Sequence, residues 1–128
     1  MKMTDKLIFR IYGEMYLVDL PQVLYFKADD HYTHVYTCTG THMVMPFGLN
    51  KVEAAITQHQ PEGNYLLRLG RTFIVNIRRI YHVNMLKQNV LLADDHGQVQ
   101  SLHFSRQVLQ SLMEHLEREC GTIPPSGI

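Results

Sequence analysis

LRLGRTFIVN, residues 67–76, is the stretch of this chain that decides the fold. Apolar and β-branched residues on both sides of a polar centre predict two short strands, at 65–69 and 72–75. Gly70 and Arg71 lie between them, and glycine is favoured at such a place because it adopts backbone conformations that other residues avoid. The stretch therefore predicts two consecutive strands with a cation at the connection.

Further short strands are predicted on both sides of this stretch, from alternating apolar residues and turn residues. They cover residues 7–12, 15–20, 23–27, 32–37 and 42–45 before it, and 80–86, 90–93 and 99–104 after it. In the strand 32–37, Tyr32, His34 and Tyr36 are expected on one face, with Thr33, Val35 and Thr37 on the other. The chain is therefore predicted to be mostly β.

Two segments have the period of a helix instead. The apolar residues of 49–56 are three and four apart, which predicts one short internal helix that ends before Pro61-Glu62-Gly63. Ser105 is a favourable N-cap for a C-terminal helix, whose apolar face is formed by Val108, Leu109, Leu112 and Leu116. One helix is thus predicted inside the chain and one at its end.

The 128 residues predict one domain over 1–120, followed by a flexible tail, 121–128, that contains two adjacent prolines. The two cysteines, Cys38 and Cys120, form no CxxC motif and suit a reducing compartment. No apolar run reaches the roughly 20 residues of a membrane helix, and the start becomes charged too early for a signal peptide. We therefore expect a cytoplasmic protein without a membrane partner.

The charge balance argues against a simple nucleic-acid binder. Twelve Lys and Arg residues match twelve Asp and Glu residues, so the formal net charge is zero with histidine neutral. Phosphate binding depends on a local basic face, however, and the eight histidines add charge when they are protonated. Composition therefore leaves DNA binding open.

The sequence gives no indication of an enzyme or of a cofactor. It contains no GxSxG, Walker A or HExxH motif, and no GxGxxG before a helix. His31 and His34, with Asp29 and Asp30 beside them, offer donors for a metal ion. Residues three apart on a strand point to opposite faces, so this metal site needs a bend in the loop and ranks below a DNA contact by His34.

Three motifs of the chain resemble the LytTR family of DNA-binding domains. The stretch 67–76 is similar to that family's Phe-Arg-x-His-Arg-Ser-Tyr-Ile-Val-Asn run, and VLYFKADDHYTHVYTCTG, residues 23–40, to its strand, acidic loop and Tyr-led strand. The end of the last strand, 102–106, resembles the family's strand-Ser-Arg-helix close, and the likeness covers about 7–116. It implies a LytTR-like elongated stack of small antiparallel sheets in a bacterial transcriptional regulator, whose loops enter successive major grooves of double-stranded DNA.

The resemblance also implies which residues contact DNA. Thr33 and His34 match the first contacting loop, Arg71 the second and Arg106 the third. Arg68, Arg78 and Arg79 are expected to join Arg71 in a basic face. The alternatives are that Arg71 is solvated or pairs with Glu62, and that Arg106 is a chance cation at an unfavourable end of the helix dipole. Asn76 is expected to brace its turn through the backbone.

One departure from the family favours a second interpretation. Gly70 stands where the family has a histidine, which removes a donor. Together with the zero net charge, this is compatible with a protein-interaction or ligand-sensing β module that has lost affinity for DNA. The length leaves no room for a receiver domain, so a stand-alone regulator is expected. Tandem or paired half-sites would bring a second copy onto the DNA, whereas a monomer in solution is equally compatible with the sequence.

Overall fold

The computed structural model describes residues 6–59 and 65–123. The strands are β1 (Lys6–Ile11), β2 (Glu14–Asp19), β3 (Val23–Asp29), β4 (Tyr32–Thr37), β5 (His42–Met45), β6 (Leu66–Leu69), β7 (Phe73–Asn76), β8 (Ile80–Asn84), β9 (Asn89–Ala93) and β10 (Val99–His103). The helices are α1 (Leu49–His59) and α2 (Arg106–Cys120), and short 3-10 turns precede β3 and β8. The predicted stop at 61–63 and the tail residues 124–128 lie outside the described residues.

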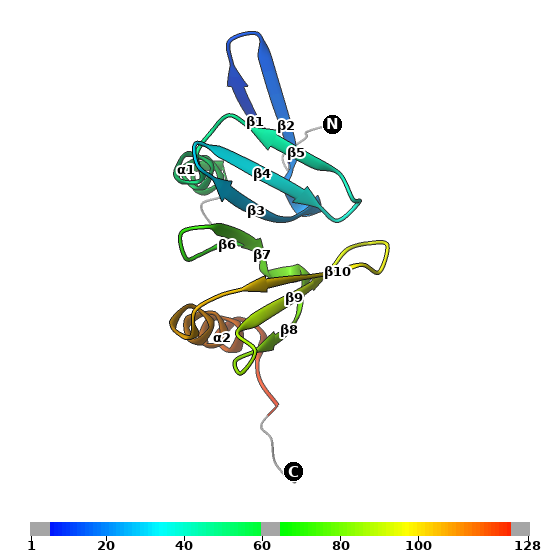
Figure 1. The fold of residues 1–128 in the computed structure, drawn as a ribbon, viewed down its shortest axis with the longest axis vertical. Helices are drawn as coiled ribbons and strands as arrows, with labels where there is room; N and C mark the ends of the chain where they lie inside the picture. The colour runs from blue at the N-terminus through cyan, green and yellow to red at the C-terminus, as the bar shows by residue number, and fades with distance from the viewer. Residues whose placement is uncertain (1–5, 60–64, 124–128) are drawn as a thin grey trace.

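Within this part of the chain the strands form three antiparallel sheets, stacked along the long axis of the molecule (Figure 1). At one end β1 and β2 form a two-stranded ribbon. The middle sheet has the order β5-β4-β3-β7-β6, and the third has the order β10-β9-β8. The predicted fold class is confirmed, and each strand lies within two residues of its predicted range. None of the described helices is long and apolar enough to cross a bilayer.

The strand β3 is a layer shared by two hydrophobic cores. Val23, Leu24, Tyr25 and Phe26 are all buried, which is why this strand is a continuous apolar run in the sequence. Val23 and Phe26 face a core that contains α1 and the ribbon, whereas Leu24 and Tyr25 face a core that contains β9, β10 and α2. The strand β3 is therefore covered on both faces, whereas the edge strand β5 keeps exposed side chains such as that of Val44, which is 42% exposed.

Asn76 fixes the end of β7. Its Nδ2 donates to the carbonyl of Val23, 2.9 Å away, and its Oδ1 accepts from the backbone N–H of Arg78 at 3.0 Å. The side chain is 1% exposed, so both bonds are shielded from water. The expectation that Asn76 braces its turn is confirmed, and the brace also ties β7 to β3.

Asn76→Ala is expected to lower the free energy of unfolding by about 1–3 kcal/mol, because it leaves the carbonyl of Val23 buried without a donor. Urea denaturation monitored by circular dichroism measures this change. Asn84→Ala is the matched control, since Asn84 accepts one backbone bond, from Lys87, in an exposed turn. An equal effect of the two substitutions would contradict the role given to Asn76.

The two helices begin as their sequences predict. Leu49, Val52 and Ile56 of α1 are buried against the middle sheet. Ser105 caps α2 by accepting from the backbone N–H of Val108 at 3.3 Å, so the helix begins at Arg106. Leu109 and Leu112 then anchor α2 in the second core. This places the first turn of α2 beside the β6–β7 connection.

Candidate nucleic-acid interface

Three turns lie along one edge of the molecule: the β3–β4 turn, the β6–β7 turn and the start of α2 (Figure 1). The backbone N–H of Ala28, near the end of β3, donates to the carbonyl of Thr72 in the β6–β7 turn at 2.7 Å. A Cβ built on Gly70, in that same turn, would lie 3.9 Å from Cγ2 of Val108 in α2. The β6–β7 turn is therefore the middle member and touches both neighbours.

Gly70 gives the β6–β7 turn its shape. Its φ of +69° lies in the left-handed region, which a glycine occupies without the steric cost of a Cβ. Leu69 and Phe73 remain paired across the turn, so the connection is tight and projects beyond the sheet. The glycine that departs from the family pattern thus has a backbone role here.

Arg71 and Arg106 are two exposed cations of this edge. Arg71 follows Gly70 in the turn, and Arg106 is the first residue of α2, whose first turn contains no acidic residue. Among residues 6–59 and 65–123, no carboxylate lies within ion-pair distance of either guanidinium. The predicted alternative partner of Arg71, Glu62, lies outside the described residues. A helix N-terminus favours anions, so this edge suits phosphate oxygens.

Lys27 is a member of this edge that the sequence interpretation missed. It is exposed, and in the middle sheet it pairs with His34 of β4 on one side and Phe73 of β7 on the other. The sequence signal that could have identified Lys27 was its position near the end of a strand, before an acidic turn. No described acid forms an ion pair with it.

Lys27 also lines a groove between the middle and third sheets. The groove has a volume of about 330 Å³ and reaches His103 at the end of β10. On the wall of this groove, the hydroxyl of Tyr25 donates to Oε1 of Gln100 at 3.5 Å. Burial, with a smaller effect of Tyr36, raises the pKa of Tyr25 to about 12, so this hydroxyl keeps its proton at any physiological pH.

His34 is held in a network of side chains. Its Nε2 lies 3.0 Å from Oδ2 of Asp29, and its Nδ1 lies 2.8 Å from Nε2 of His42, with the two rings stacked at 5.0 Å. When both rings are neutral, His42 donates to His34 and His34 donates to Asp29. A contact between His34 and DNA would replace one of these bonds, and it remains a prediction.

His31 does not join this network. Its ring is 91% exposed and lies 3.6 Å from a carboxylate oxygen of Asp30. His31 and His34 therefore have different partners and do not converge. Among the described residues, no group of three or more His, Cys, Asp or Glu side chains is placed to hold a metal ion.

Thr33 has an internal role instead of an exposed one. Its side chain is fully buried, and its hydroxyl donates to the carbonyl of Phe47 at 2.7 Å. This bond joins the start of β4 to the segment that leads into α1. Thr33 thus anchors the start of β4 with its hydroxyl bonded inside the protein, and the DNA contact that the resemblance implied for this residue remains a prediction.

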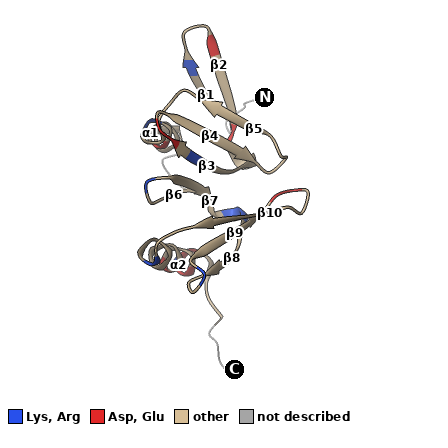
Figure 2. Cartoon of the chain, viewed as in Figure 1, with Lys and Arg blue, Asp and Glu red and all other residues tan. Residues whose placement is uncertain are grey.

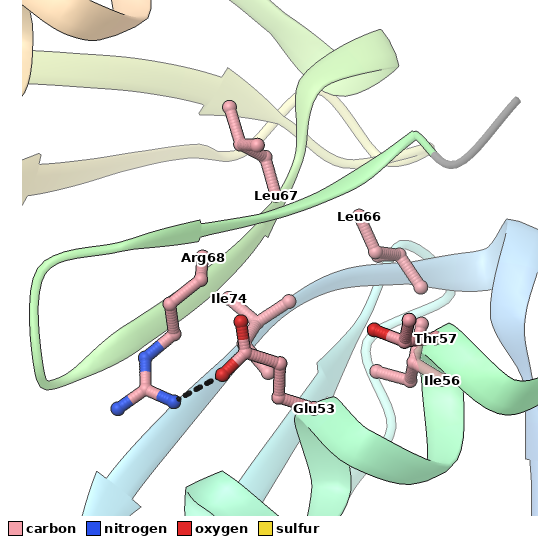
Figure 3. A pocket seen from close by; sticks show the side chains of 7 residues that line it. All are labelled: Glu53, Ile56, Thr57, Leu66, Leu67, Arg68 and Ile74. Atoms are coloured by element: carbon pink, nitrogen blue, oxygen red, sulfur yellow. Dashed lines mark hydrogen bonds and ion pairs between the residues drawn. The ribbon is translucent and has the colours of Figure 1, made fainter. Parts of the chain in front are cut away.

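Arg68 braces the β6–β7 turn from inside. Its guanidinium donates to the carbonyls of Gly70 and Arg71, and its Nη1 lies 2.9 Å from Oε1 of Glu53 on α1 (Figure 3). A fourth contact, to Oδ1 of Asn50, uses the same Nη1. Arg68 therefore orients the turn that presents Arg71, while its own charge is paired.

Arg78 and Arg79 lie apart from Arg71. The Arg78 guanidinium lies 4.5 Å from the ring centre of Tyr65, in a hollow beside the C-terminal half of α2. Arg79 pairs with Asp95 at 2.9 Å, in the β9–β10 turn on the opposite edge. The prediction of one basic face with all four arginines is thus corrected, because the turn after β7 sends these side chains elsewhere.

Positive charge is present on the edge formed by the three turns but is not confined to it, since Lys and Arg positions also mark β1, the turn beside β10 and the β8–β9 turn (Figure 2). Lys and Arg positions mark β3, the β6–β7 turn and the start of α2, whereas the β9–β10 turn on the opposite edge is acidic. Glu114, Glu117 and Glu119 follow in the second half of α2. Carboxylates are present on the edge of the three turns too, because Asp29 and Asp30 lie at the β3–β4 turn and Glu53 pairs with Arg68 beside the β6–β7 turn. The net charge of zero therefore conceals an edge with unpaired cations.

Cys38 is a buried thiol behind the opposite edge. Its Sγ donates to Oε1 of Gln22 at 2.7 Å and accepts from Arg79 at 3.3 Å. Burial, and next a hydrogen bond with Asp95, raises the pKa of Cys38, while Arg79 offsets part of this rise. The Arg79 guanidinium also lowers the pKa of Asp95. The Cys38 thiolate is thus disfavoured at neutral pH.

In the native protein one thiol is therefore expected to react rapidly with an aromatic disulfide reagent at about pH 7.5. Cys120 is exposed, whereas Cys38 is buried and its raised pKa reduces the fraction of reactive thiolate. Counting released thiolate by absorbance, with and without denaturant, measures both groups. Cys120→Ser should remove the rapid phase. Two rapid thiols in the native protein would contradict this account.

Comparisons with known proteins agree with this fold. The family model described as LytTr DNA-binding domain matches residues 13–117. A solved structure described as a LytTr DNA-binding domain from Bacillus cereus superposes with a TM-score of 0.61 at 19% identity, and covers 88% of this chain and 96% of its own. At this identity the likeness shows the fold. A search of curated proteins finds no match. Since the matched range includes most of the chain, the protein belongs to the LytTR family of DNA-binding domains.

Proposed function

We propose that the protein is a sequence-specific transcriptional regulator whose turns enter successive major grooves of double-stranded DNA. The observation that carries this proposal is the adjacency of three turns, the second and third of which present Arg71 and Arg106 without a described acidic partner. Arginine forms paired hydrogen bonds with O6 and N7 of guanine, and it also binds phosphate. Lys27 is included as a phosphate contact between the first two turns. Since its partner is DNA, we propose that it acts in the bacterial cytoplasm.

The family membership supports the coarser part of this proposal, DNA binding by a regulator. The structure supports the finer part through the contacts that hold the turns in place. Arg68 and Gly70 shape the second turn, Thr33 anchors the first, and Ser105 caps the helix that begins the third. Base readout requires donors at fixed positions, because a displaced guanidinium group loses its paired hydrogen bonds with guanine.

Selection of bound duplexes from a random pool tests the proposal, followed by gel shifts of the selected site over a series of salt concentrations. We expect enrichment of a defined sequence and an affinity that falls as salt rises, because phosphate contacts release counterions. Absence of enrichment, with binding at background even at low salt, would overturn the proposal.

A second candidate is a protein-interaction or ligand-sensing module, favoured by the two carboxylates of the β3–β4 turn. Asp29 and Asp30 lie at the proposed interface, where they would repel phosphate. The same selection discriminates the two functions. Replacement of both residues with asparagine should strengthen duplex binding in a DNA-binding protein, whereas a module without affinity for DNA should remain at background.

A further inference from the structure

The β1–β2 ribbon exposes an apolar face at the end of the molecule remote from α2 (Figure 1). Leu7, Phe9 and Val18 point into the core, so their neighbours in the two strands point outward. These neighbours are Ile8, Met15 and Leu17, with exposed fractions of 52%, 49% and 48%. The inner face is thus packed and the outer face is uncovered by any described residue.

The outward residues form a continuous strip across both strands. Ile8 is paired with Leu17, and Arg10 with Met15, in the antiparallel register. Beside Leu17 a groove of about 320 Å³ continues toward Met43 and Val35 of the middle sheet. A two-stranded sheet is marginally stable by itself, and contiguous exposed apolar surface of this kind marks interaction sites.

We propose that this strip is a self-association surface, which binds the same strip of a second copy of the chain. The argument for a second copy is the placement of charge at one end of the strip. Lys6 on β1 and Asp19 on β2 are directly opposite each other, and their side chains are 3.9 Å apart. A basic group on one strand and an acidic group on the other make the face complementary to itself under a suitable two-fold rotation.

That rotation has its axis parallel to the strands. It lays β1 of one copy over β2 of the other at the same height, so Ile8 meets Leu17, Lys6 meets Asp19 and Arg10 meets Met15 of the second copy, twice each. Lys6 and Asp19 of the two copies then form a cluster of four charges of alternating sign. A two-fold axis that crosses the strands at Ile8 would instead place Lys6 over Arg10 of the second copy, which puts like charges together. The charge pattern therefore selects the first arrangement.

This association goes beyond the proposed function and does not depend on it. The strip lies at the other end of the molecule from α2, so it leaves the DNA-facing edge accessible. In addition, β1 precedes residues 13–117, the range that matches the family. The ribbon therefore lies only partly within the range that matches the family. Self-association through it is expected in the absence of DNA.

Sedimentation velocity of the full chain without DNA, over a series of protein concentrations, tests the proposal. We expect a monomer–dimer equilibrium whose dissociation constant rises at least roughly tenfold in Ile8→Lys, because each dimer would bury two unpaired charges. Val99→Lys is the matched control, since Val99 is 52% exposed on β10, in the third sheet. A monomer at every concentration, or equal effects of the two variants, would overturn the proposal.

Charge reversal separates contacts between copies from the ion pair within one copy. Lys6→Glu and Asp19→Lys should each weaken self-association, because each places like charges opposite each other in its own dimer. An equimolar mixture of the two should associate again. The new carboxylate of the first variant then meets the new ammonium group of the second, and the Lys6 that remains in the second variant meets the Asp19 that remains in the first. Thermal melts confirm that both variants fold. Failure of the folded mixture to form a heterodimer would overturn the proposed geometry.

Discussion

Arg71→Ala and Arg106→Ala are each expected to weaken binding of the selected duplex by about 1–3 kcal/mol, roughly 5- to 150-fold. Each guanidinium is exposed at the tip of a braced turn, and none of the described acids pairs with it. A contact with a base should also relax the sequence preference at one position, whereas a phosphate contact should reduce the salt slope by about one. Gel shifts with the selected site and with single-base variants distinguish the two.

Arg118→Ala is the matched control for both substitutions. Arg118 is an exposed arginine on the same helix as Arg106, twelve residues later, which is about 18 Å along the axis. The substitution Arg118→Ala removes the same charge but leaves the edge formed by the three turns unchanged. Equal losses of affinity in Arg118→Ala and Arg106→Ala would indicate a general effect of net charge and would contradict a localised interface.

Phe26→Ala is expected to lower the free energy of unfolding by about 3–5 kcal/mol. The Phe26 side chain is fully buried in the core that joins α1 and the ribbon to the middle sheet, so its removal leaves a cavity. The free energy of unfolding of a domain of this size is about 5–15 kcal/mol in total, so the variant would be near its stability limit. Urea denaturation at about 25 °C measures the difference.

Tyr81→Ala provides the comparison, because Tyr81 is an aromatic strand residue that is 57% exposed. Its effect should stay below about 1 kcal/mol. Should both substitutions destabilise the protein equally, the packing described for β3 would be wrong. Since Phe26 is two residues from the Ala28 bond to Thr72, folded Phe26→Ala protein should also show a looser β6–β7 turn.

Most of the fold could be predicted because it depends on local patterns. The alternation in β4 placed Thr33 and Val35 on one face, and both are buried. The helical period found α1, and Ser105 located the start of α2. The predicted strand 80–86 ends earlier, at Asn84, because Asn84 accepts from the backbone N–H of Lys87 and begins the turn.

The pairing of charged side chains could not be predicted, since it depends on contacts between distant residues. Arg68 pairs with Glu53 and Arg79 with Asp95, 15 and 16 residues away, across elements whose arrangement the sequence does not state. Thr33 was expected at the interface because the resemblance implied it, although the alternation of its strand placed it on the same face as the apolar Val35. Lys27 was overlooked because a lone lysine at a strand end has no distinguishing spacing, and its importance comes from its neighbours on β4 and β7.

The burial of β3 on both faces has a consequence for how the molecule opens. Val23 and Phe26 serve one hydrophobic cluster while Leu24 and Tyr25 serve the other, so neither half of the protein can come apart without exposing part of the remaining half to water. Partly opened species should therefore be rare. Amide protons of this strand should exchange with deuterium only when the entire chain unfolds, and heat should melt the protein in one cooperative step.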